Sequence, residues 1–163
     1  MSSFTITNTD DAILTALDTT LTAARETGIG LLFAQVVSAG SVEEAKQTLL
    51  KESATAVLVY ASTTDHKISD LEWGQLCHVD IVLAVKANTQ ALRQTAITRL
   101  IAGTKTAVET DQPSDTAGFL SEGDFHRRLE WGEPSLDLLT NLPWAVAVLP
   151  LSVAYVIATR LSR

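Results

Sequence analysis

A histidine and an aspartate two residues apart are the side chains of this sequence best suited to chemistry. His78 and Asp80 fall within an alternating apolar run, so in a strand both project from one face, about 6 to 7 Å apart. An imidazole and a carboxylate at that spacing could hold a metal ion or orient a proton transfer. No third ligand lies close in sequence, and the plainer interpretation is a polar strand face or a contact between subunits.

The single cysteine, Cys77, points to the opposite face of the same predicted strand from His78. The two residues therefore cannot bind one ion together, and we expect Cys77 to lie in the core. One cysteine allows neither an intramolecular disulfide nor a cysteine-rich zinc site, which is compatible with a reducing cytoplasm. No cofactor is predicted.

Two basic motifs only partly match the patterns of phosphate-binding sites. Residues 103–106, Gly-Thr-Lys-Thr, resemble the end of a phosphate-binding loop, but they lack the upstream glycine and lie in a helical pattern. His126, Arg127 and Arg128 form the densest positive cluster and could grip phosphate. Because Glu130 and Glu133 follow closely, we expect a solvated face or an ion-pair contact with a neighbouring subunit instead.

The three tryptophans lie at the beginning or end of predicted strands, where both a core and an interface role are open to them. The sequence has no G-x-S-x-G, H-E-x-x-H or paired C-x-x-C motif, so no residue is predicted to be catalytic and the protein is not expected to be an enzyme. The candidate interface residues are Trp73, His78, Asp80, Arg127, Arg128, Trp131 and Trp144.

The N-terminal half of the chain predicts two helices and two short strands. Ser41 and Glu44 have the spacing of a capping box, in which the serine accepts from the backbone and the glutamate reaches back. Gly28 and Gly30 are expected to end the first helix. The predicted elements are a helix over 10–27, a strand over 31–37, a helix over 41–51, a strand over 56–60 and an exposed connection over 62–70.

The C-terminal half predicts two long strands around one amphipathic helix. The helix is predicted over 89–109 with an apolar stripe that includes Leu92, Ile97 and Leu100. The predicted elements are strands over 73–87, 126–131 and 144–159, a loop over 111–123 and a connection over 132–143. This order predicts an α+β fold, a mainly antiparallel sheet with two main helices packed on one face, in a single domain over 1–163.

Composition sets broad limits on function. The chain has 163 residues, 46% apolar, with twelve basic and nineteen acidic side chains and a net charge of −7. Nucleic-acid affinity comes mainly from clustered Lys and Arg, so we do not expect the protein to bind phosphates tightly. An acidic surface could still line a conduit for DNA, because it repels the DNA and so prevents it from sticking to the wall. The N-terminus lacks signal-peptide features, so secretion is not expected.

Residues 142–159 raise the question of a membrane anchor, because they carry no formal charge and Arg160 follows them. Two prolines, Pro143 and Pro150, interrupt the segment, and from Leu149 onward large apolar residues alternate with small ones. A half-buried strand explains that period better than a lipid-facing helix does. A membrane-tethered host protein therefore stays an alternative that we do not favour.

Taken together, the order of elements resembles the tail terminator and related minor tail proteins of long-tailed bacteriophages. The resemblance is carried by Ala-Val-Leu-Val-Tyr at 56–60, Trp-Gly-Gln-Leu-Cys-His-Val-Asp-Ile-Val-Leu-Ala-Val at 73–85, Val-Glu at 108–109, Leu-Glu-Trp-Gly at 129–132 and the closing run at 144–155. The segments at 41–51 and 111–123 depart from shorter members of that family. These departures leave open the terminator itself, another neck component or a tail-tube relative.

The resemblance implies a structural virion protein, located in the tail or neck and assembled in the host cytoplasm. Such proteins form a homo-oligomeric ring, generally a hexamer, that caps the tail tube and joins it to head-neck connector proteins. The expected partners are the tail tube protein and those connectors, with DNA only as cargo in the lumen and no membrane. The alternatives are another neck or minor tail component, or a small α+β ligand-binding domain or enzyme with a pocket near His78, Asp80 and His126.

Overall fold

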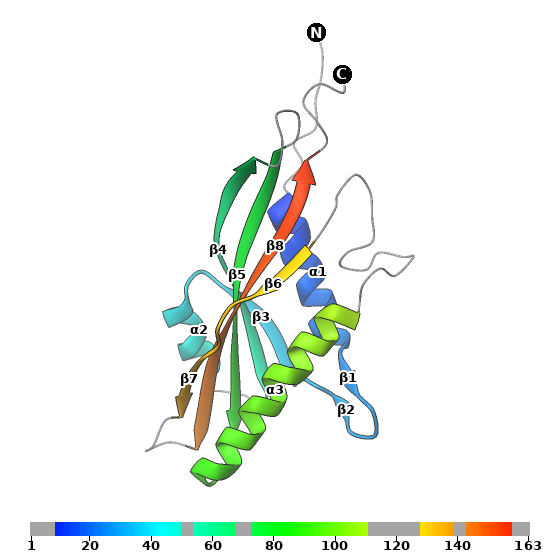
Figure 1. Cartoon of the computed structure of the whole chain (residues 1–163). Helices are drawn as coiled ribbons and strands as arrows, with labels where there is room; N and C mark the ends of the chain where they lie inside the picture. Colours follow the sequence, from blue (N-terminus) through cyan, green and yellow to red (C-terminus); the bar gives the residue numbers. More distant parts are fainter. Residues whose placement is uncertain (1–8, 50–53, 68–72, 111–127, 139–142, 158–163) are drawn as a thin grey trace.

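The computed structural model describes residues 9–49, 54–67, 73–110, 128–138 and 143–157. They form one α+β body in which helices α1 (Thr9–Ala23) and α3 (Gln90–Thr110) pack against one face of a six-stranded sheet (Figure 1). A short helix, α2 (Val42–Leu49), packs on the opposite face. The predicted fold class is confirmed, and the predicted loop over 111–123 lies outside the described residues.

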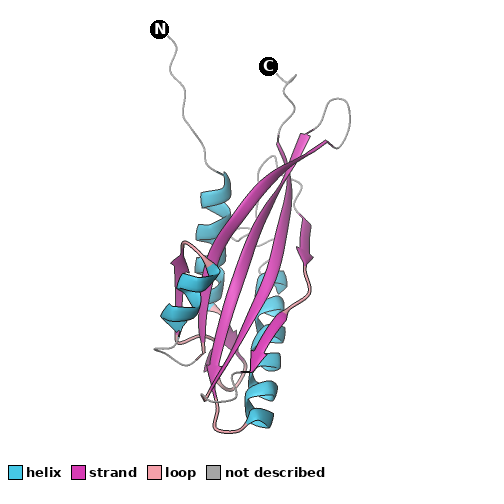
Figure 2. Ribbon diagram, turned by 90° about the vertical axis from the view of Figure 1, so that its left-hand side faces the viewer, coloured by secondary structure: helices cyan, strands magenta, loops and turns pink. Residues whose placement is uncertain are grey.

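The sheet is mixed but mostly antiparallel. Its strand order is β3-β4-β5-β8-β6, β7 also pairs with β8, and only the β3–β4 pair is parallel. Three long strands run the length of the molecule and twist together (Figure 2). The strands are β3 (Gln35–Ala39), β4 (Thr55–Lys67), β5 (Trp73–Lys86), β6 (Arg128–Trp131), β7 (Ser135–Leu138) and β8 (Trp144–Ile157).

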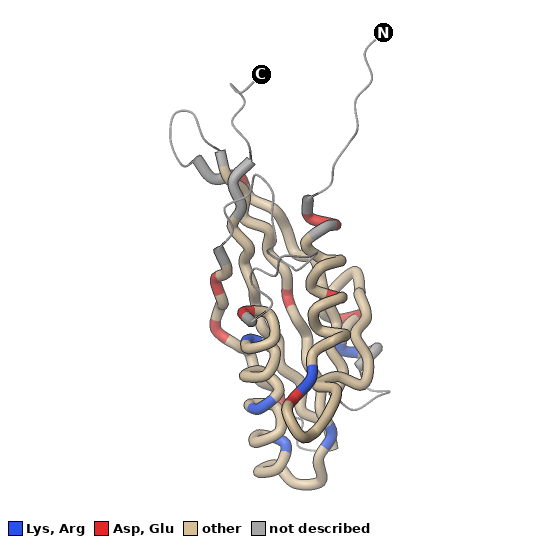
Figure 3. Tube along the Cα trace, turned by 90° about the vertical axis from the view of Figure 1, so that its right-hand side faces the viewer, with Lys and Arg blue, Asp and Glu red and all other residues tan. Residues whose placement is uncertain are grey.

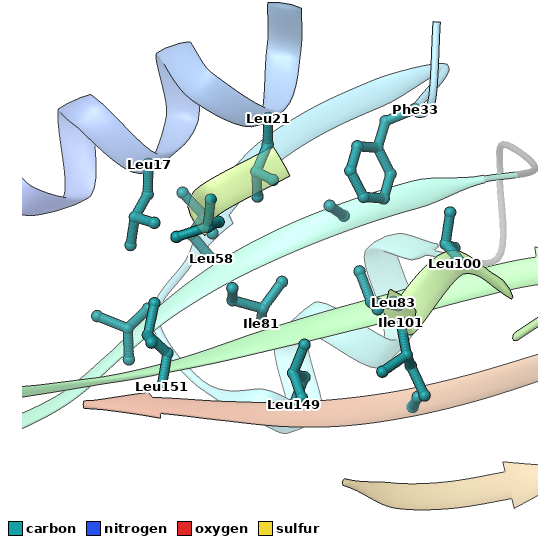
Figure 4. Packing of buried hydrophobic residues seen from close by; sticks show 14 of the residues in the cluster. Leu17, Leu21, Phe33, Leu58, Ile81, Leu83, Leu100, Ile101, Leu149 and Leu151 are labelled. Carbon is teal, nitrogen blue, oxygen red and sulfur yellow. The ribbon is translucent and has the colours of Figure 1, made fainter. Parts of the chain in front are cut away.

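Alternation along β5 explains how one strand serves two cores. Side chains at odd positions, such as Ile81 and Leu83, join the main core under α1 and α3, whereas Val82 and Ala84 join a second cluster under α2. The sequence predicted burial on one face only; α2 is the reason that both faces are buried over this part of the strand. Figure 4 shows the main core, where leucines and isoleucines from α1, α3 and the long strands meet.

The first helix is shorter than predicted. It ends at Ala23, and the chain then forms a small antiparallel hairpin from β1 (Arg25–Glu26) and β2 (Gly30–Leu31). Gly28 and Gly30 have φ angles of +82° and +112°, so they shape this hairpin instead of ending the helix. The predicted strand over 31–37 is accordingly split between β2 and β3.

The capping box predicted for the second helix is confirmed. The Ser41 hydroxyl accepts a 3.1 Å hydrogen bond from the Glu44 N–H. The Glu44 carboxylate accepts a 3.0 Å bond from the N–H of Gly40, one residue before the expected partner. The serine thereby satisfies one orphan donor at the start of α2, and the glutamate ties the preceding residue to the helix.

Two predicted connections are strands in the structure. Residues 62–67 continue β4 past a β-bulge between Tyr60 and Ser62. Within the predicted connection over 132–143, β7 pairs with the start of β8. Polar composition misled both predictions, because these segments pair through their backbones while most of their described side chains, at 62–65 and 135–137, are exposed.

Pro150 lies in the interior of β8 without breaking it. One edge of β8 pairs with β5. Along its other edge, residues up to Val148 pair with β7, and residues from Leu151 onward pair with β6. The proline falls in this gap, where a missing N–H costs the ladder least. Gly132 donates a 2.9 Å bond to the Pro150 carbonyl, and a Cβ on Gly132 would lie 3.0 Å from the proline ring.

The third helix begins after Thr89, whose hydroxyl accepts from the Leu92 N–H at 3.2 Å. Leu92 itself is 56% exposed, so its place in the predicted buried stripe is wrong, and Arg93 is buried at this level instead. Ile97, Leu100 and Val108 are buried as predicted.

Candidate functional site

His78 and Asp80 lie on the face of the sheet that α2 occupies farther along the strands. We call this surface the polar α2 face and define it by Ser62, Thr64, His78, Asp80 and Ser152. The His78 ring joins three strands, because Nδ1 lies 2.8 Å from the Ser152 hydroxyl on β8 and Nε2 lies 3.2 Å from the Thr64 hydroxyl on β4. Both ring nitrogens therefore have hydroxyl partners.

Asp80 is next to His78 on this face and sits opposite Pro150 in the ladder. Burial raises the pKa of its carboxyl above the ordinary value, while the nearby His78 opposes that shift. Among the described residues, no group of three His, Cys, Asp or Glu side chains is arranged to hold a metal ion. The polar α2 face is thus a hydrogen-bonded strand surface that carries one imidazole and one carboxylate.

Two of the three tryptophans have defined places in the structure. Trp144 is 9% exposed in the second core cluster, and the Lys86 ammonium lies 6.0 Å from the centre of its ring. Trp131 packs at the edge of the main core, where its Nε1 donates a 3.0 Å hydrogen bond to Glu109 and Lys105 lies 5.9 Å from its ring. Trp144 consequently has little surface to offer a partner, and Trp131 joins β6 to α3.

The remaining candidate interface residues are only partly placed. Trp73 and Arg128 are the first residues of β5 and β6, and their side chains lie outside the described part of the structure. Arg127 and His126 lie outside it altogether. The structure thus brings His78 and Asp80 together and does not test a convergence with His126.

A second polar cluster, on the α1/α3 side of the sheet, was not predicted. Asp10 accepts hydrogen bonds from the hydroxyls of Thr63, at 2.6 Å, and Tyr60, at 3.4 Å. Cys77 is fully buried beside them, and burial, followed by the nearby Asp10 carboxylate, raises the pKa of its thiol to about 12. No sequence signal marks this cluster, because the bulge in β4 brings these residues together.

A cavity of about 730 Å³ opens between α1, the β1–β2 hairpin and α3. Its floor consists largely of small side chains, including Ala102 and Gly103, and an ion pair between Arg99 and Glu26 crosses its rim. Leu32 closes against Gly103, where a Cβ would lie 3.0 Å from its side chain. Close packing against Leu32 thus explains a glycine in α3, where helix propensity disfavours one.

Comparison with known protein families found no family model that matches this chain, and comparison with curated proteins found no match. Within the described residues, no helix is long and apolar enough to cross a membrane. The segment that raised the membrane question forms strand β8 through Ile157.

Proposed function

We propose that the protein is a structural virion protein of a long-tailed bacteriophage, a tail terminator whose subunits form a ring that caps the tail tube. The observation that carries the proposal is an open sheet edge. β4 pairs with β5 along its whole length, but β3 pairs with β4 only from Thr55 to Val59. Within the described residues, 60–67 therefore have a strand neighbour on one side only.

The opposite edge of the sheet supports the same proposal. It is formed by β6 and β7, two strands of four residues each, and not by another long strand. Exposed strand edges are templates for pairing with another chain. Pairing one edge with the different edge of the next subunit is a heterologous contact, which closes into a ring when the rotation fits.

The remaining parts of the proposal rest on the sequence resemblance and on charge. The ring, generally a hexamer, would meet the tail tube protein on one side and the head-neck connectors on the other. DNA would pass through its lumen as cargo, which suits a chain with a net charge of −7. In this proposal the protein performs no catalysis, binds no cofactor and acts in the virion after assembly in the host cytoplasm.

The test is the mass of the full chain by light scattering across protein concentrations, with and without tail tubes, followed by negative-stain imaging. We expect rings with a central hole, alone or seated on tubes. Ser62→Lys should shift assembly to higher concentration, because a lysine on an edge strand disfavours pairing. Gln94→Lys on the exposed surface of α3 is the matched control. A monomer under every condition, tubes included, would refute the proposal.

A small α+β enzyme is the second candidate, and the 2.8 Å contact between Ser152 and His78 favours it. In a Ser-His-Asp triad, a carboxylate accepts from the other ring nitrogen, whereas here Thr64 occupies that position. Treatment with a fluorophosphonate, with Ser152→Ala as control, separates the two candidates. Covalent labelling of Ser152 would favour the enzyme, and the absence of labelling would favour the structural protein.

A further inference from the structure

Arg93 is a buried cation with an incomplete set of partners. Its side chain is 6% exposed, and its Nη1 donates a 3.1 Å hydrogen bond to the Ala87 carbonyl. Among the described residues, its Nε has no hydrogen-bond acceptor. A buried charged group without partners is costly, so a guanidinium held in this state points to a missing anion.

The guanidinium lies at the N-terminus of its own helix. Ala87 precedes the capping residue Thr89 by two positions, so the Arg93 side chain folds back over the first turn of α3. The first N–H groups of a helix lack partners within it and carry partial positive charge, which favours bound anions. The Leu92 N–H is already bonded to Thr89, so the first-turn donors left for an anion beside Arg93 are the N–H groups of Gln90 and Ala91.

The surrounding chain supplies no compensating carboxylate in sequence. Ala87 accepts Arg93 on its carbonyl and donates to Pro143, so the end of β5, the start of α3 and the start of β8 meet here. Residues 84–94 and 138–148, which span this junction, contain Lys86 and Arg93 and no Asp or Glu, and the adjacent Asp137 is exposed on β7. The first turns of α1 and α2 each carry two acidic residues, whereas that of α3 has none.

The charge pattern of the whole subunit agrees with this local picture. Figure 3 shows the Lys and Arg positions gathered in the half of the molecule that holds α3 and the β1–β2 hairpin, while acidic positions also extend to the other end. Because Arg93 is only 6% exposed and its Nε is fully covered, an extended nucleic-acid backbone cannot reach it, and a single small group must displace part of this cover to bind.

We propose that Arg93 and the N-terminus of α3 form a binding site for one oxyanion, a carboxylate or a phosphate group. The Arg93 Nε–H and the first N–H groups of α3 donate to its oxygens, and the Ala87 carbonyl holds the guanidinium in position. The site does not depend on ring formation, so its failure and the failure of the proposed function are separate results.

The test uses sodium phosphate and sodium acetate as probes on the full chain, with ionic strength held constant by sodium chloride. The thermal midpoint is followed by tryptophan fluorescence, and the backbone N–H signals of Gln90 and Ala91 are followed by NMR. We expect a saturable rise in the midpoint together with shifts of those two signals. A response to phosphate alone identifies a phosphate ligand, and an equal or larger response to acetate identifies a carboxylate.

Two variants decide whether Arg93 is responsible. Arg93→Met keeps the volume without the charge and should lose the saturable response, whereas Arg99→Met, which removes an exposed cation on the same helix, should keep it. Arg93→Lys covers the case in which Arg93→Met does not fold, and its apparent Kd should be about tenfold or more weaker. The site is refuted if neither probe acts on the wild type, or if the Arg93 variants respond as the wild type does.

Discussion

The hydroxyl of Thr63 donates a 2.6 Å hydrogen bond to Asp10, which lies 53 residues earlier in the chain. This contact fastens the first turn of α1 to β4 just beyond the bulge, and the Tyr60 hydroxyl lies 2.9 Å from Thr63 in the same group. Asp10 has two further roles, since acidic residues stabilise a helix N-terminus and its charge faces the buried Cys77. A single carboxylate thus connects helix, sheet and thiol.

Replacing Asp10 with alanine should lower the free energy of unfolding by about 1.5 to 3 kcal/mol, because hydrogen bonds to a charged acceptor are lost. Urea denaturation followed by circular dichroism measures the change. Thr63→Val is the matched comparison, since it removes the 2.6 Å donor and leaves the Asp10 charge at the helix N-terminus. A Thr63→Val variant as stable as the wild type would show that the hydrogen bond to Thr63 contributes nothing beyond the helix-dipole effect of Asp10.

The buried thiol of Cys77 should make stability fall in alkaline solution. Burial and Asp10 raise its pKa from an ordinary 9.0 to about 12 in the folded state. Between these values the unfolded chain loses the proton and the folded chain keeps it, so ionisation favours unfolding. The contribution of the protonated thiol to the free energy of unfolding is complete below pH 9. It is lost as the pH rises toward 12, by up to about 1.4 kcal/mol per pH unit.

Cys77→Ser provides the comparison, because a serine does not titrate in this range. As the pH rises from 9 upward, the free energy of unfolding of the wild type should fall relative to that of the Cys77→Ser variant. In the folded wild type, a thiol reagent should also react slowly near neutral pH and rapidly after unfolding in urea. Parallel pH profiles for the two proteins would contradict the raised pKa.

The sequence predicted the fold best where burial follows a period. Alternation at 73–87 and 144–159 predicted β5 and β8, and the capping box predicted the start of α2. It failed where backbone pairing is independent of side-chain polarity, as in residues 62–67 of β4 and in β7. It also placed Leu92 in the core, because the buried face of α3 follows Arg93, Ile97, Leu100 and Thr104, and the arginine and threonine on this face carry no apolar signal.

The candidate site was predicted in part for the same reason. The period of a strand places His78 and Asp80 on one face, but register alone brings Ser152 within 2.8 Å of His78 from a strand 74 residues later. Asp10, Tyr60 and Thr63 meet because of a bulge, and Arg93 is buried because its side chain folds back to Ala87. These arrangements depend on backbone geometry that composition and spacing do not encode.

Asp80→Asn should stabilise the protein at neutral pH. Burial raises the pKa of this carboxyl in the folded state, so the unfolded chain ionises first as the pH rises and the charged form opposes folding. The advantage of asparagine should therefore be present near pH 7 and vanish below the ordinary aspartate pKa of about 4. Thermal midpoints at the two pH values measure it, with the exposed Asp137→Asn as control. A variant less stable than wild type at pH 7 would contradict the shift.

Trp131 should contribute to stability through its indole N–H as well as through its ring. Its Nε1 donates to Glu109 at 3.0 Å, while Lys105 lies 5.9 Å from the ring centre. Trp131→Phe keeps an aromatic surface beside Lys105 and loses the hydrogen bond, so it should lower the free energy of unfolding by about 1 kcal/mol or more.

Glu109→Gln separates the two contributions, because the amide oxygen can still accept from the indole. It should cost less than Trp131→Phe. Glu109→Ala removes the acceptor, so the double variant of Glu109→Ala with Trp131→Phe should cost less than the sum of its two single changes, as expected for residues in contact. Glu133→Gln, an exposed carboxylate near Trp131 in sequence, is the matched control. Strict additivity in the double variant would show that the hydrogen bond does not hold β6 against α3, and Trp131 would then be free to serve the subunit contact proposed for it.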